Sequence, residues 1–134
     1  MLIIRYFAGM LNTRYLLLLL LLLGASCYNP PRDCKAFKEG TFRFTAIIDG
    51  KEQTTTFERY NDREIDYFEG KADTSSIRWI NDCEYIVKKL RPQDAAEEKS
   101  IHMKILTTTD SSYTFEYGLV GSSNKSKGTA IKVN

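Results

Sequence analysis

The chain has 134 residues, of which 43% are hydrophobic and 12% aromatic, and its 19 Lys and Arg stand against 17 Asp and Glu. A chain of this size suffices for one small domain with its own core, and its aromatic content argues against disorder. The near balance of charge lacks both the basic excess typical of nucleic-acid-binding proteins and a polybasic stripe for anionic lipid. We therefore expect no nucleic-acid partner.

The N-terminal segment has the three parts of a secretory signal. Arg5 and Arg14 precede a run of eight leucines at 16–23, and three small residues then lead to Cys27. A positive region, an apolar region and a small-residue zone in this order are typical of a cleaved signal. Only about eleven apolar residues are continuous, against about 20 in a spanning helix, which disfavours a transmembrane anchor. Met10 also begins a complete signal, so the start is open between Met1 and Met10.

The small residues that end at Cys27 resemble the cleavage site of bacterial lipoproteins. The resemblance implies that a peptidase cuts before Cys27 and that the sulfur of Cys27 carries a diacylglycerol. The expected partner of the chain is therefore a membrane, to which this lipid attaches it. We expect a signal peptide at 1–26 and a lipid-anchored tether at 27–39, with an uncleaved anchor and ordinary secretion as the alternatives. The mature 108 residues then carry 17 basic and 17 acidic side chains, because the signal contains two arginines and no acid.

Two cysteines remain once Cys27 is assigned to lipid. An even pair in an oxidising envelope compartment favours a disulfide, so we expect Cys34 and Cys83 to be bonded, with two free thiols as the alternative. On the chain-entropy model, closing a loop of about 50 residues contributes ~4 kcal/mol to stability. Two cysteines and the single, distant His102 match no spacing of metal ligands, so we expect neither a metal nor another cofactor.

Alternation of apolar and polar residues begins at Gly40 and predicts β-strands through the rest of the chain. The expected strands lie at 40–48, 53–60, 63–69, 75–80, 83–90, 101–105, 113–119 and 129–133. The tight turns between them are expected at 49–50, 61–62, 81–82 and 110–112, and the loops at 70–74 and 121–128. Residues 93–99 favour one helical turn, too short to stand alone, as a connector.

Eight short strands joined mostly by short turns predict an all-β domain at 40–134, folded as an antiparallel up-and-down meander. Such a meander protects its edges by closing on itself, so we expect a barrel or a half-barrel. A β-sandwich is the alternative, but its crossing connections are longer than most of these turns.

Four segments of the mature chain carry a likeness to a known group: Cys27-Tyr28-Asn29-Pro30, Arg32-Asp33-Cys34, Gly40-Thr41-Phe42 and the run from Ser76 to Tyr85. They resemble small lipoproteins of Bacteroidetes, chiefly flavobacteria, whose mature part is a lipocalin-like β domain. Such chains sometimes bear the label "DNA topoisomerase IV", which implies an ATP-binding domain and a large DNA-gripping domain. A neutral, exported domain of 108 residues has room for neither. By resemblance to known sorting patterns, the lack of an acidic run after Cys27 implies an outer-membrane lipoprotein facing the periplasm.

Residue types required for catalysis are sparse. Nucleophilic catalysis needs a base beside a serine or cysteine, and the single His102 alternates with apolar residues on the expected solvent face of a strand. Carboxylate pairs occur at Glu64 and Asp66 and at Glu97 and Glu98. The first pair shares one strand face, as glycosidase acids can, but we assign it to a charged outer face. We expect no enzymatic activity.

An aromatic cluster is the candidate binding site. If the barrel encloses a cavity, we expect its lining to include Trp79, Tyr85, Tyr113, Phe115 and Tyr117. The same side chains also suit a filled core. The sequence therefore favours a small hydrophobic ligand in the barrel, with a module that binds another envelope protein as the alternative. That module requires a filled core and an exposed apolar patch.

Overall fold

The computed structural model describes residues 31–134, which form eight β-strands and one short 3-10 helix, η1. The elements are η1 (Lys35–Phe37), β1 (Gly40–Ile48), β2 (Lys51–Tyr60), β3 (Arg63–Phe68), β4 (Lys71–Asn81), β5 (Glu84–Lys89), β6 (Ile101–Thr108), β7 (Ser112–Leu119) and β8 (Ser126–Lys132). Each predicted strand has a counterpart. The expected signal peptide at 1–26 and the lipidated Cys27 lie outside the described residues.

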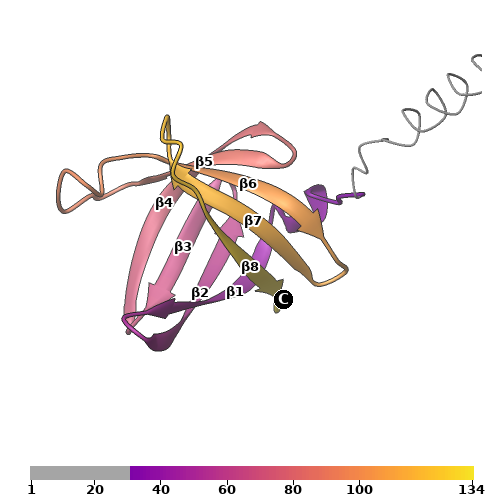
Figure 1. Cartoon of the computed structure of the whole chain (residues 1–134), viewed down its shortest axis with the longest axis horizontal. Helices are drawn as coiled ribbons and strands as arrows, with labels where there is room; N and C mark the ends of the chain where they lie inside the picture. Colours follow the sequence, from indigo (N-terminus) through magenta and orange to yellow (C-terminus); the bar gives the residue numbers. More distant parts are fainter. Residues whose placement is uncertain (1–30) are drawn as a thin grey trace, which may run out of the picture. The chain divides into compact units, whose positions relative to one another are not determined.

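The strands form one antiparallel sheet that closes into a barrel. Neighbours in sequence are neighbours in the sheet from β1 to β8, and β8 pairs back to β1 through Phe42–Lys132 and Phe44–Ala130. Figure 1 follows the wall from the purple β1 through the pink β3 to β5 and on to the orange and yellow β6 to β8. The prediction of an all-β, up-and-down barrel is confirmed, and the sandwich alternative is excluded.

Two-residue turns with positive φ set the register at three of the seven strand connections. The turns at 49–50, 61–62 and 69–70 have positive φ at both residues, the conformation that matches the twist of the flanking strands in tight hairpins. The first two lie where the sequence predicts them. The third replaces the loop expected at 70–74, because this short turn leaves Lys71 already paired with β3.

Strand pairing also shifts other boundaries away from the expected ones. β8 begins at Ser126, inside the loop expected at 121–128, because Ser126 pairs with Tyr117 of β7. Cys83 lies in the turn between β4 and β5, which begins at Glu84. The segment after β5 is the connector that the sequence predicts, with the amide of Glu98 donating to the carbonyl of Asp94 at 3.3 Å in a single helical turn.

The end of the barrel that carries the turns at 61–62 and 82–83 is filled by residues 34–37, and we call it the closed end. Cys34 and Cys83 form the predicted disulfide, with Cα atoms 5.2 Å apart. The next residues make η1, and Phe37 points from it into the core with 1% of its surface exposed. Residues from Cys34 onward, which the sequence assigns to the tether expected at 27–39, thus pack against the barrel.

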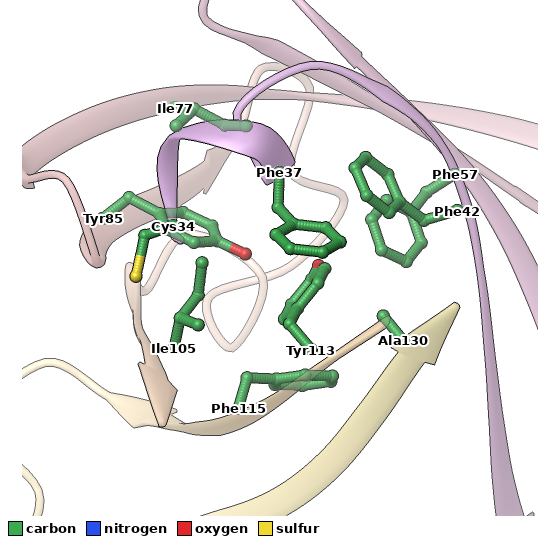
Figure 2. Packing of buried hydrophobic residues seen from close by; sticks show 10 residues of the cluster. All are labelled: Cys34, Phe37, Phe42, Phe57, Ile77, Tyr85, Ile105, Tyr113, Phe115 and Ala130. Atoms are coloured by element: carbon green, nitrogen blue, oxygen red, sulfur yellow. The ribbon is translucent and has the colours of Figure 1, made fainter. Parts of the chain in front are cut away.

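The aromatic core gathers around Phe37, as Figure 2 shows. The ring centroid of Phe37 lies 5.2 Å from that of Tyr113, and Phe42 stacks on Phe57 at 5.2 Å. The buried apolar residues are Cys34, Phe37, Phe42, Phe57, Ile77, Tyr85, Ile105, Tyr113, Phe115 and Ala130. Their concentration at the closed end leaves the other half of the barrel interior less filled.

Candidate functional site: a cavity inside the barrel

A cavity of about 500 Å³ lies in the barrel interior and extends onto the connection between β5 and β6. We call the end of the barrel at this connection the open end. The apolar lining comes from five strands and the β5–β6 connection and consists of Phe44, Phe57, Val87, Ala96, Ile101, Met103, Tyr113, Phe115, Tyr117 and Leu119. The polar lining consists of Thr55, Arg59, Glu64, Asp66, Ser75, Lys89, Asp94, Glu97 and Lys99. The cavity therefore has an apolar wall facing a charged one.

The apolar wall depends on the absence of a side chain at Gly128. A Cβ atom there would lie 2.6 Å from Phe44 Cε2 and 2.9 Å from Phe115 Cζ. The two rings meet over this glycine edge to face, with centroids 5.4 Å apart. This arrangement is a favourable one for aromatic pairs. Gly128 thus positions the aromatic surface along β1 and β7.

The inner end of the cavity rests on Arg59, whose side chain lies at the centre of a buried hydrogen-bond network. Its Nε and Nη2 atoms donate to Oε2 of Glu64 at 3.0 and 2.9 Å. Nη1 donates to the carbonyl of Phe37 at 2.8 Å, and Nη2 also donates to the hydroxyls of Tyr85 and Tyr113 at 2.7 and 3.2 Å. One guanidinium therefore links β2, β3, β5, β7 and η1.

Aromatic faces surround the same guanidinium. Its Cζ atom lies 4.7 Å from the ring centroid of Tyr85, 5.1 Å from that of Phe42 and 5.4 Å from that of Phe57. Rings at these distances attract a desolvated cation. Burial raises the pKa of Tyr85 well above 10.0 and also raises that of Tyr113. Both hydroxyls therefore stay neutral and remain acceptors for Arg59.

The charged wall brings three carboxylates together on β3 and β4. Glu64 and Asp66 share the inner face of β3, and Asp73 lies directly across from Asp66 on β4. Like charges opposite each other destabilise a sheet. Lys89 compensates in part, since its Nζ bonds Oδ2 of Asp73 at 2.7 Å and Oε1 of Glu97 at 2.8 Å. Burial first, and then the charges of Glu64 and Asp73, raise the pKa of Asp66 to about 7.

The connection between β5 and β6 forms one side of the cavity's mouth at the open end, and hydrogen bonds of Glu97 hold this connection in place. Besides Lys89, Glu97 accepts a hydrogen bond from the amide of Gln93 at 2.9 Å, and its own amide donates to Oδ1 of Asp94 at 2.8 Å. The amide of Leu90 donates to the carbonyl of Thr74 on β4 at 3.0 Å. These bonds fix the segment that carries Asp94 and Glu97 beside the cavity.

The predicted aromatic cluster divides between two places. Tyr113, Phe115 and Tyr117 line the cavity. Tyr85 is fully buried beneath it and holds Arg59 rather than facing the cavity. Trp79 packs against Tyr85 with ring centroids 4.5 Å apart and planes tilted by 44°, and it is absent from the cavity lining. The last two residues therefore belong to the closed end.

Glu64 and Asp66 contradict the expectation that they lie on an outer face. Glu64 is 8% exposed, and Asp66 lines the cavity. The register explains their position: Arg59 lies opposite Glu64, and Phe57 lies opposite Asp66. Residues opposite each other in a sheet share a face, so the buried Arg59 and Phe57 bring both carboxylates inside. The two-residue turn at 61–62 fixes the register of β2 and β3, so this turn in the sequence is the signal from which both pairs can be predicted.

His102 lies on the outer face that the sequence predicts, whereas the contact between Lys89 and Glu97 is not predicted by the sequence. Nε2 of His102 lies 3.0 Å from Oε2 of Glu84, on the face of β6 that points away from the core residue Ile105. Lys89 and Glu97 meet across the β5–β6 connection, a contact that strand periodicity does not report. Within residues 31–134, no three His, Cys, Asp or Glu side chains converge in a group suited to hold a metal.

Comparison with known proteins gives no match: no protein-family model, no curated protein and no solved structure is significantly similar to this chain. In the part of the chain that the structure describes, no helix has the length and hydrophobicity needed to cross a bilayer.

Proposed function

We propose that this chain is a lipid-anchored protein of the cell envelope whose barrel binds a small, mainly apolar ligand. The observation that carries the proposal is the cavity of about 500 Å³ with a wall of aromatic and aliphatic side chains. This volume lies within the range of roughly 300 to 1,000 Å³ found for small-molecule sites. A module that binds its partner on the outer sheet surface needs a filled core, so the cavity favours a ligand inside the barrel.

The rigidity of the closed end supports the same function. The disulfide, η1 and the Arg59 network fix the inner end of the cavity before any ligand arrives. A preformed site avoids the entropic cost of ordering side chains on binding. The polar groups of the opposite wall then orient a ligand whose apolar part lies against Met103, Phe115 and Tyr117.

Titration with N-phenyl-1-naphthylamine, a neutral apolar dye that brightens when buried, tests the cavity. The full chain is used with Cys27→Ser, which removes the thiol required for lipid attachment. Met103→Trp fills the cavity and is expected to weaken dye binding about tenfold or more. Ile80→Trp is the control, because Ile80 is 52% exposed and absent from the lining. Dye binding that is absent, or equally strong in both variants, would contradict the proposal.

The envelope anchor has its own test, the intact mass of the protein extracted from membranes. The leucine run and Cys27 support a mature chain that begins at Cys27 and carries lipid. We expect that mass for the parent and its loss in Cys27→Ala, with two hydrogens gained on reduction of the Cys34–Cys83 disulfide. An unprocessed chain without acyl groups would refute the anchor and leave the cavity proposal standing.

A further inference from the structure

The charges on the cavity wall do not balance. The lining contains Glu64, Asp66, Asp94 and Glu97 as acids and Arg59, Lys89 and Lys99 as bases, and Asp73 lies beside it. The cavity lining thus carries four carboxylates and three cations, and the adjoining recess adds Glu69 and Asp73 as acids and Lys71 and Arg91 as bases.

Two of the three cations are already committed to protein carboxylates. Arg59 is 2% exposed and bonds Glu64 through two nitrogen atoms. Lys89 bonds Asp73 and Glu97 at once. Lys99 is exposed on the connection at the mouth. A ligand in the cavity therefore meets negative charge that the protein has left uncompensated.

Asp66 is the carboxylate of the described lining that has neither an ion pair nor a side-chain hydrogen bond, whereas Asp94 accepts the amide of Glu97. Within residues 31–134, no side-chain hydrogen bond and no ion pair reaches the oxygens of Asp66. It faces Glu64 on its own strand, Asp73 on β4, Arg59 on β2 and Lys89 on β5, the last two being held by other acids. Asp66 also borders the adjoining polar recess that contains Lys71 and Arg91, so its carboxylate is reachable from the cavity and from the mouth.

From this placement we infer that the ligand of the proposed site is an amphipathic cation, an amine on an apolar body, whose charged nitrogen pairs with Asp66. The inference rests on the proposed function and specifies the ligand class. The apolar body lies against Phe115 and Tyr117, across the cavity from the acidic wall. An apolar anion such as a fatty acid would meet the same carboxylates, and the one lining cation of residues 31–134 without an ion pair is Lys99, which is exposed at the mouth and not inside the barrel.

The ionisation of Asp66 makes the inference dependent on pH. A bound amine favours the charged carboxylate, whereas without ligand this carboxyl has a pKa of about 7 because of its burial and of Glu64 and Asp73. Amine affinity should therefore rise from pH 5.5 to pH 8, while the affinity for an uncharged analogue should change little. Arg59 and Lys89 keep their charge across this range and do not contribute to the change.

Competition against bound N-phenyl-1-naphthylamine separates the ligand classes. Dodecylamine, dodecanol and dodecanoate share one chain length and differ in head group, and they are used below the concentrations at which they aggregate. At pH 8 we expect dodecylamine to displace the dye at about tenfold lower concentration than dodecanol, the typical gain from a charged hydrogen bond. Dodecanoate should be the weakest of the three.

Asp66→Asn should remove the advantage of dodecylamine over dodecanol. The control is Glu52→Gln, which removes the same charge from an exposed position of β2 and should retain the advantage. Equal displacement by amine and alcohol in the parent chain, or an advantage that survives Asp66→Asn, overturns the inference while the cavity proposal stands. If neither the dye nor dodecanol binds, the proposed function itself fails and the inference falls with it.

Discussion

Asp66→Asn should stabilise the protein at pH 8, an unusual outcome for a substitution inside a barrel. In the native state the pKa of Asp66 is raised from 3.8 to about 7 by burial and by neighbouring carboxylates. At about 1.36 kcal/mol per pKa unit, the ionised carboxylate costs at most about 4 kcal/mol of folding free energy above pH 7. Water in the cavity screens part of this cost, so we expect a gain of about 2 to 4 kcal/mol from the neutral amide.

The sign of the effect follows from proton binding. Between the unfolded and the folded pKa, the native state binds more protons, so the stability of the parent chain falls as pH rises from 4 to 8. Asp66→Asn removes this fall. At pH 4 the carboxyl of Asp66 is largely protonated in the native state, and this pH is close to the pKa of 3.8 that it has in the unfolded chain. The free energies of unfolding of the variant and the parent should therefore differ by less than about 1 kcal/mol.

Urea unfolding at pH 4, 6 and 8, with the disulfide intact, measures the difference. Glu52→Gln serves as the control, since an exposed substitution away from special features changes stability by about 0.5 kcal/mol or less at every pH. A loss of stability at pH 8, or a gain of the same size at pH 4 and pH 8, would show that Asp66 is not the strained charge described above.

Three further substitutions test the closed end and the apolar wall. Arg59→Met leaves a buried carboxylate and two tyrosine hydroxyls without their donor, and should lower the urea-derived stability by about 3 to 5 kcal/mol. Cys34→Ser should cost about 4 kcal/mol and abolish the effect of reductant on the thermal midpoint, because the bond to Cys83 closes a separation of 49 residues. Gly128→Ala should cost about 1 to 3 kcal/mol in the same unfolding assay, and should weaken binding of the naphthylamine dye as the two rings move into the cavity.

The barrel could be predicted from the sequence because its signals are local. Period-two alternation and turn residues at 49–50 and 61–62 fix where strands begin and end, and short connections leave neighbouring strands little choice but to pair. The stripe from Tyr113 to Tyr117 alternates inward as its pattern predicts. The disulfide followed from the number of cysteines and the expected compartment, and the structure places Cys34 beside Cys83.

The charged wall was not predicted, because it depends on the strand next to it. On β3 the apolar residues Ile65 and Tyr67 alternate with acids, and this pattern by itself predicts an outer, charged face for Glu64 and Asp66. The pairing with β2 places these acids on the inner face instead, because Phe57 is 7% exposed and lies opposite Asp66. Combining the predicted turn at 61–62 with the side on which β2 buries its aromatics would have found both acids.

Residues far from any periodic pattern lay beyond sequence reasoning for a different reason. Phe37 is the one aromatic residue in a short stretch rich in lysine, and only its contact with Tyr113 shows that it belongs to the core. Lys89 and Glu97 meet because the β5–β6 connection folds back on β5. Neither contact repeats along the chain, so neither produces a period that a sequence can display.

The two ends of the barrel resolve their buried charges in opposite ways. At the closed end, Arg59 has an acid, two hydroxyls and a carbonyl to satisfy its donors. Toward the open end, Asp66 faces Asp73 without a cation of its own. One buried charge is thus fully satisfied, and another is left unpaired beside a cavity. A binding site commonly keeps such a destabilising group, because the group that lowers stability is the one that contacts the ligand. The same residue should therefore link two measurements: the variant that gains stability at pH 8 should be the one that no longer distinguishes an amine from an alcohol.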